Sequence, residues 1–151
     1  MVERTPDPKG EVMGRHWGED WGDNHPHRDI TEAIILAAIR VQIVLGPGLL
    51  ENACKACLAH ELRLAGHQAL REVHLDITYK GLCVENAYIM DLVADHKGVI
   101  EAKAIATFSD ADFAQLNSCL HFANSKAGLL IHFHNWPLKD GGIKRLVNTK
   151  P

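Results

Sequence analysis

The sequence contains no apolar run long enough to cross a membrane, no excess of basic residues and no internal repeat. A membrane-spanning helix needs about 20 consecutive apolar residues, and the polar start of the chain does not have the pattern of a signal peptide, so we expect a cytoplasmic protein. The formal net charge of −3 provides no overall attraction to nucleic acid, so any such binding must use a local basic patch. In a reducing cytoplasm the cysteines are expected to be free thiols. They are Cys54, Cys57, Cys83 and Cys119.

Residues 1–28 have few aliphatic side chains and many Gly, Pro, Asp, Glu and His residues. Such a segment cannot bury enough apolar surface to fold, so we predict a flexible polar arm that is dispensable for folding. Its tryptophans, Trp17 and Trp21, could dock on the domain or on a partner, and the sequence leaves both open. Residues 29–151 are long enough for one domain with a sizeable core.

The periodicity of apolar residues changes along this domain and predicts its elements. We expect two helices, three strands, a helix and two strands, at residues 30–45, 49–65, 73–79, 88–94, 99–104, 110–124, 127–133 and 143–148. Asp29 with Glu32, and Ser109 with Asp112, have the spacing of capping boxes at helix starts. The strand–helix–strand unit between residues 99 and 133 predicts one parallel strand pair with a right-handed crossover.

Three charged residues interrupt the strands at 88–94 and 99–104: Asp91, Glu101 and Lys103. Charges are rarely buried in a strand without a partner or a function. Because side chains alternate along a strand, Glu101 and Lys103 share a face. A three-residue loop at 95–97, with Gly98 in a left-handed bulge conformation, would bring Asp91 to the same face.

Two adjacent carboxylates cannot both ionise cheaply without a cation between them. Mg²⁺ or Mn²⁺ suits such hard oxygen ligands and can activate a water and hold a phosphate oxygen. Lys103 would then orient the nucleophile or neutralise developing charge. A structural salt bridge between Lys103 and one acid explains the same residues equally well.

Glu51 provides a further acid on the helix predicted at 49–65. It falls within the apolar stripe of that helix, where an unpaired carboxylate is costly. If the helix covers the sheet, Glu51 could reach the same cation. Alternatively, it complements the dipole at the helix N-terminus.

Several segments together resemble the GxxExxY family of the PD-(D/E)XK nuclease superfamily. They follow in the family's order from Ile30 to Asn148, and they are GPGLLENACKACLAHELRLAG, LDITYKG, the Asp of YIMDLV, IEAKA, FAQLNSCL, AGLLIHF and GGIKRLVN. The resemblance implies an α/β fold with a restriction-endonuclease-like core, in which α-helices flank a mixed β-sheet. It also implies that the matches to Asp91 and Glu101 bind Mg²⁺ and that the match to Lys103 assists the attacking water.

The resemblance extends to two motif residues outside the strands and fails at two others. Glu51 matches the acid of the helical motif, and Gln115 matches the glutamine of a Q-x-x-x-Y motif. Cys54 and Cys119 stand where the family has tyrosines, so both positions lose a ring and a phenol donor. The acids and the lysine are retained, which favours an intact catalytic centre, whereas the missing tyrosines leave substrate positioning and activity open.

Two functions are therefore predicted. The first is a metal-dependent nuclease that hydrolyses phosphodiester bonds of nucleic acid, with DNA the expected substrate. The second is a catalytically inactive domain of the same fold, used for nucleic-acid binding or partner assembly. A homo-oligomer is compatible with both. Basic residues near the C-terminus could contact phosphates or form a solvated edge, and they are Lys139, Lys144, Arg145 and Lys150.

Two short pairs also have ligand-like spacing. Cys54 and Cys57 could form a redox or zinc pair, and His132 and His134 share one face of a predicted strand. With no further cysteine or histidine placed beside them by the sequence, we predict packing thiols and surface or hydrogen-bonded core histidines.

Overall fold

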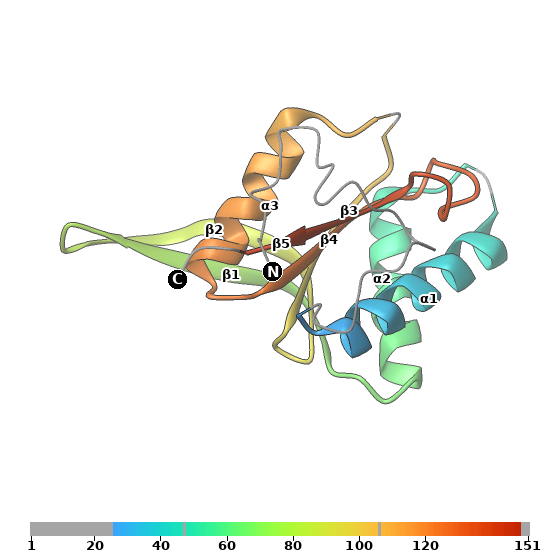
Figure 1. The fold of residues 1–151 in the computed structure, drawn as a ribbon, viewed down its shortest axis with the longest axis horizontal. Helices are drawn as coiled ribbons and strands as arrows, with labels where there is room; N and C mark the ends of the chain where they lie inside the picture. Colours follow the sequence, from blue (N-terminus) through green and yellow to red (C-terminus); the bar gives the residue numbers. More distant parts are fainter. Residues whose placement is uncertain (1–25, 47, 106, 149–151) are drawn as a thin grey trace.

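A five-stranded mixed sheet with helices on both faces forms the protein (Figure 1). The computed structural model describes residues 26–46, 48–105 and 107–148. In chain order the elements are α1 (Arg28–Leu45), α2 (Glu51–Leu64), β1 (Ala69–Tyr79), β2 (Leu82–Ala94), β3 (Gly98–Lys103), α3 (Asp110–Phe122), β4 (Ala127–His132) and β5 (Ile143–Val147). The strand order is β1-β2-β3-β4-β5, and β3 and β4 are parallel while the other pairs are antiparallel. The predicted mixed sheet and parallel pair are confirmed.

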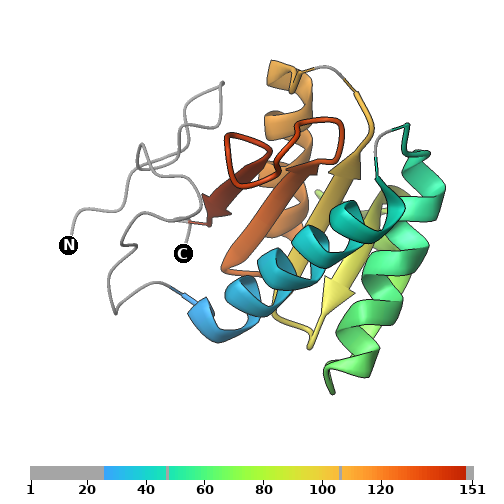
Figure 2. The same ribbon diagram turned by 90° about the vertical axis from the view of Figure 1, so that its right-hand side faces the viewer.

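Helices cover the two faces of the sheet unequally. Helices α1 and α2 lie on one face and α3 lies on the other (Figure 2). Successive β3 residues therefore enter different cores, with Ile100 facing α1 and α2 and Val99 facing α3. Central strands covered on both faces are buried throughout, and every residue of β4 is buried. A charged residue in β3 is consequently placed deep inside the protein.

The two predicted capping boxes have different outcomes. At α3, the Ser109 side chain accepts a hydrogen bond from the Asp112 backbone and the Asp112 carboxylate bonds back to Ser109, as predicted. At α1, the prediction is wrong, because the helix begins at Arg28 without a side-chain cap. The Glu32 carboxylate instead accepts from the guanidinium of Arg28, at 2.8 Å, across one helical turn.

The turn between β2 and β3 has the predicted three residues but not the predicted conformation. The left-handed residues are Asp95 and His96, with φ of 51° and 55°, whereas Gly98 has no positive φ. Gly98 is instead required for close packing, because a Cβ there would lie 3.1 Å from Ile34 Cδ1 of α1. The Asp95 carboxylate fixes the turn by bonding to His67 Nδ1 and to the Gln68 N–H.

Strands β1 and β2 form a long ribbon that projects beyond the helices (Figure 1). Lys80 and Gly81 make its two-residue turn, both with positive φ, as hairpin turns of this length require. β2 begins at Leu82, six residues earlier than predicted, because the outer half of the ribbon is exposed and lacks the alternation that burial imposes. Tyr79 and Leu82 at the tip are each 61% exposed.

The predicted arm falls largely on residues 1–25, which include Trp17 and Trp21 and lie outside the described residues. Its dispensability stays a prediction. The last residues of the proposed arm belong to the folded part, because α1 begins at Arg28 and the Arg145 guanidinium donates to the Pro26 carbonyl. Among the described residues, no helix is both long and apolar enough to span a bilayer.

Candidate active site

Strands β2 and β3 separate at Asp91. Their ladder runs from Ala94↔Gly98 to Leu92↔Ile100. At the next position, Asp91 Oδ2 accepts a hydrogen bond from the Ala102 backbone N–H at 3.0 Å. A side-chain carboxylate thus takes the place of a backbone carbonyl, and it lies in the fork between the strands. The register of the ladder places Glu101 opposite Asp91.

Glu101 is 2% exposed and lies on the α3 face of β3, like Val99. Burial, followed by the charge of Asp91 and a hydrogen bond with Asp91, raises the pKa of Glu101 to about 8, against the opposing charges of Lys103 and Lys55. Its Oε1 atom is buried and has no hydrogen-bond partner in the described part of the chain. Without a nearby divalent cation, a pKa of about 8 favours the protonated form of Glu101 at neutral pH.

Lys103 ends β3 two residues after Glu101, on the same face. It is half-buried, and its charge lowers the pKa of Glu101. Within the described residues its ammonium forms no ion pair. The predicted alternative of a structural salt bridge between Lys103 and an acid is therefore not formed, and Lys103 remains available to a substrate.

The ion pair with Asp91 is made by Lys55, a residue that the sequence analysis missed. Its Nζ lies 2.9 Å from Asp91 Oδ1 and 3.6 Å from Glu51 Oε1. Burial lowers the pKa of Lys55, but the hydrogen bond and charge of Asp91, with the charges of Glu51 and Glu101, outweigh it, so the pKa is raised. The Lys55 ammonium of α2 therefore stays charged and lies at the fork between β2 and β3. The i, i+4 spacing of Glu51 and Lys55 was a signal that could have identified the lysine.

Glu51 is the first residue of α2, and its side chain is 42% exposed. It reaches Asp91 only through Lys55. No group of three His, Cys, Asp or Glu side chains in the described ranges is arranged to hold a metal ion. Glu51 is thus at the edge of the cluster, in the position where its charge also complements the helix dipole.

Cys54 and Cys119, the positions at which the resemblance predicts tyrosines, are both fully buried. Burial, followed by the charges of Glu101 and Asp91, raises the pKa of Cys119 to about 11. Burial also raises the pKa of Cys54 to about 11. Both are therefore neutral thiols. Gln115 lies one turn before Cys119 on α3, and its side chain is exposed.

The family assignment follows from the sequence as a whole. The profile described as the PD-(D/E)XK nuclease superfamily matches residues 28–146. The chain belongs to the PD-(D/E)XK nuclease superfamily. Searches of curated proteins and of solved structures each gave no match. The mixed sheet between helices is the fold of this superfamily, as predicted, whereas membership of the GxxExxY family stays a prediction.

PD-(D/E)XK nucleases generally use divalent metal ions, and the residues at the fork fit such an ion. Asp91 and Glu101 provide hard oxygen atoms, the type of ligand that Mg²⁺ and Mn²⁺ prefer. Glu101 Oε1 is buried without a partner among the residues that the structure describes, which is costly unless a cation or a proton compensates it. Burial, followed by the charge of Asp91, raises the pKa of Glu101, so a bound cation would favour the ionised form that the buried position disfavours.

The other predicted ligand residues, at the two cysteine and histidine pairs, do not form a metal-binding group in the described part of the chain. The four cysteines are free, and Cys57 is partly buried. His132 is buried, whereas His134 is exposed and its Nε2 lies 3.1 Å from the Leu49 carbonyl oxygen. The predictions of packing thiols and of surface or core histidines agree with these positions.

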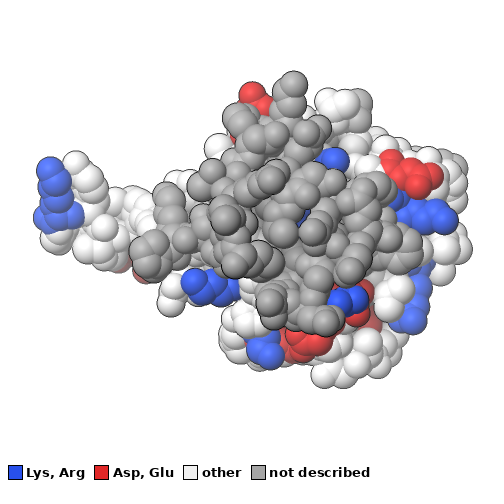
Figure 3. Space-filling model, viewed as in Figure 1, with Lys and Arg blue, Asp and Glu red and all other residues white. Residues whose placement is uncertain are grey.

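The predicted basic segment near the C-terminus does not form one surface. Arg145 is 4% exposed and bonds to Pro26, so it is not available to phosphates. Lys139 is exposed, Lys144 is half-buried, and Lys150 lies outside the described residues. Basic and acidic side chains are interspersed over the described surface seen in Figure 3. Lys144 and Arg145 are adjacent in the sequence, but side chains alternate along β5, so the two point to opposite faces of the sheet.

Proposed function

We propose that this protein is a metal-dependent nuclease that hydrolyses phosphodiester bonds, with DNA as its substrate. The observation that supports this function is the Asp91–Glu101 pair at the fork of β2 and β3, with one buried carboxyl oxygen that has no partner among the described residues. Mg²⁺ or Mn²⁺ held by these acids would supply the charge that stabilises a phosphate and lowers the pKa of a water.

The surrounding residues would orient the acids, the attacking water and the substrate. Lys55 orients Asp91, since its ammonium donates to Oδ1 while the Ala102 N–H donates to Oδ2. Glu101 must lose its proton to act as a ligand, which is easier once a cation is beside it. Lys103, which makes no ion pair in the described part, would position the attacking water or offset charge on the phosphate. The Gln115 side chain is exposed on α3, where it could contact the substrate backbone.

A second function is favoured by one contact. The Lys55 ammonium lies 2.9 Å from Asp91 Oδ1, so the fork already has a cation of its own. Together with Cys119 in place of a tyrosine, this arrangement also fits an inactive domain that binds nucleic acid without cleaving it.

Cleavage assays on single- and double-stranded DNA and RNA, each with Mg²⁺, Mn²⁺ or EDTA, test the proposal. We expect metal-dependent cleavage of DNA that is lost in Asp91→Asn and in Lys103→Ala. Glu85→Gln is the matched control, because Glu85 is an exposed acid on the same strand as Asp91. Binding of DNA without cleavage under all these conditions would support the inactive domain instead.

A further inference from the structure

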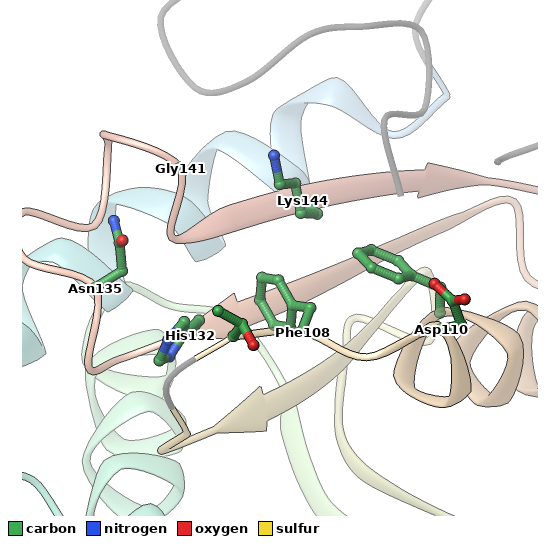
Figure 4. Close-up of a pocket in the computed structure, with 8 residues that line it drawn as sticks. Phe108, Asp110, His132, Asn135, Gly141 and Lys144 are labelled. Carbon is green, nitrogen blue, oxygen red and sulfur yellow. The ribbon is translucent and has the colours of Figure 1, made fainter. Parts of the chain in front are cut away.

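A pocket of about 440 Å³ opens near the end of β4, where β4 leaves the sheet (Figure 4). Its walls come from Thr107 and Phe108 before α3, from the start of α3, from the end of β4, from the β4–β5 connection and from the start of β5. Its volume lies within the range of about 300–1,000 Å³ that is typical for small-molecule sites. None of its residues belongs to the acid pair.

The strand register connects this pocket to the acid pair. Lys103 of β3 is paired with His132 of β4, and Leu130 of β4 is paired with Lys144 of β5. Paired residues on neighbouring strands point to the same face and lie about 5 Å apart. Because Glu101 is itself paired with Leu130, the acid, Lys103, His132 and Lys144 all occupy the α3 face. A substrate strand at the acids would therefore pass Lys103 and enter the pocket.

His132 gives the pocket an unused polar group. The side chain is 5% exposed, yet its Nδ1 atom has no hydrogen-bond partner in the described part of the chain. Leaving such a group unsatisfied is costly, and because Nδ1 itself is buried, the imidazole ring must turn before a ligand in the pocket can bond to it and gain that free energy. Imidazole Nδ1 can donate or accept, depending on the tautomer.

Aromatic and charged side chains complete the walls. The Phe108 ring meets the His132 ring edge-on, with centroids 5.5 Å apart, and Phe108 is only half-buried. Among the described lining residues, Lys144 is the one cation of fixed charge and Asp110 the one acid. A pocket without net charge suits an uncharged planar group better than a second phosphate. The ammonium of Lys144 makes no ion pair within the described ranges, so it can bind a phosphate at the rim.

We propose that this pocket binds the nucleobase next to the phosphodiester held at Asp91 and Glu101. Phe108 provides a face on which the base stacks, His132 Nδ1 bonds to an edge of the base, and Lys144 binds the following phosphate. This subsite rests on the proposed nuclease function, and it would determine which nucleotide is preferred beside the cleaved bond.

Binding of deoxynucleoside 5′-monophosphates tests the subsite without any cleavable bond. Each of the four nucleotides is titrated into ¹⁵N-labelled full-length protein, and NMR shifts are followed at residues 107–113, 132–135 and 141–144. We expect saturable shifts at these residues, with unequal affinities among the four bases. Phe108→Ala should weaken binding by about five- to 100-fold, as the loss of a stacking contact does. Phe108→Leu, which retains apolar volume without the ring, separates stacking from folding.

Two further variants test the polar groups. Lys144→Ala should weaken the binding of all four nucleotides by a similar factor, because it contacts the phosphate. Lys139→Ala is the matched control, since it removes an exposed lysine outside the pocket and should leave binding unchanged. His132→Leu should reduce the difference in affinity among the bases.

The results separate this proposal from the nuclease proposal. Nucleotide binding that is insensitive to Phe108→Leu and Lys144→Ala, or that shifts other residues, overturns the subsite even if DNA is cleaved. Binding at the pocket in a protein that cleaves nothing retains the subsite and rejects the nuclease. Binding that persists in Asp91→Asn, in which the acid pair is altered, is also expected.

Discussion

Lys55 Nζ lies 2.9 Å from Asp91 Oδ1, and this contact joins α2 to the fork between β2 and β3. A lysine therefore holds the carboxylate that we propose as a metal ligand. Both side chains are largely buried, with 19% and 14% exposure, so the attraction between them is weakly screened by solvent. A divalent ion at the fork must share Asp91 with an ammonium that is already there.

Removing the Lys55 ammonium should show whether it competes with a divalent ion for Asp91. We expect Lys55→Gln to lower the free energy of unfolding of the metal-free protein by about 1–3 kcal/mol, because Asp91 loses a charged hydrogen-bond partner. The same variant should bind Mn²⁺ more tightly, since the competing positive charge is gone. Calorimetric titration and chemical denaturation measure the two effects, and Lys97→Gln, on the exposed turn, is the control. Weaker Mn²⁺ binding in Lys55→Gln would instead show that the lysine organises the site.

The raised pKa of Glu101 predicts how stability depends on pH. Between its ordinary value of 4.5 and the folded value of about 8, the folded state holds a proton that the unfolded state releases. Stability of the metal-free protein should therefore fall as pH rises through this window, by up to about 1.4 kcal/mol per pH unit. Denaturation with EDTA at pH 5, 6, 7 and 8 measures this slope. Glu101→Gln should flatten it, whereas equal slopes in the two proteins would exclude Glu101 as its source.

Divalent ions should stabilise the protein by binding the native state. At a hundred times the dissociation constant, binding adds about 2.7 kcal/mol, which corresponds to a rise of about 5–10 °C in the melting temperature of a domain of this size. Mn²⁺ should have a larger effect than Mg²⁺ at equal concentration. Differential scanning fluorimetry checks both ions.

Two variants distinguish the effect of metal on the melting temperature from catalysis. Asp91→Asn should lose most of the rise in melting temperature, because it removes a ligand charge. Lys103→Ala should keep the rise and lose cleavage, because a lysine is no ligand. A wild-type melting temperature that is indifferent to both ions would contradict the proposed metal site.

The cysteines should react in the order of their exposure. Cys83 is exposed on the β1–β2 ribbon, whereas the pKa values of Cys54 and Cys119 are raised by burial to about 11. A thiol reacts as the thiolate, so iodoacetamide at pH 8 should label Cys83 first and leave the two buried cysteines unlabelled until the protein unfolds. Mass spectrometry of peptides after timed labelling identifies the sites. Early labelling of Cys119 would indicate that α3 opens away from the acids.

The sequence predicted the cluster better than the contacts within it. Alternation along β3 correctly put Glu101 and Lys103 on one face, because burial on both sides of a central strand enforces that pattern. The contact of Asp91 with the Ala102 N–H could not be predicted in the same way, because it arises where the ladder stops. No periodic pattern marks the residue at which two strands separate.

Contacts between distant elements were missed for a related reason. The spacing of Glu51 and Lys55 shows only that they are neighbours on α2, and the distance from Lys55 to Asp91 depends on how that helix crosses the sheet. The outer part of β2 was missed because exposed strands carry no alternation, as at Leu82. Arg145 was expected among basic surface residues, yet it is buried and donates to the carbonyl of Pro26, which precedes α1.

The hydrogen bond from Ala102 to Asp91 makes one backbone amide a sensor of the site. The resonance frequency of an amide proton bonded to a carboxylate changes when that carboxylate gains a proton or shares its oxygen with a cation. The Ala102 signal in a spectrum of ¹⁵N-alanine-labelled protein should therefore follow protonation and ion occupancy at the fork, independently of any substrate. Its rate of hydrogen exchange with solvent would report, in the same sample, how often the two strands part at this position.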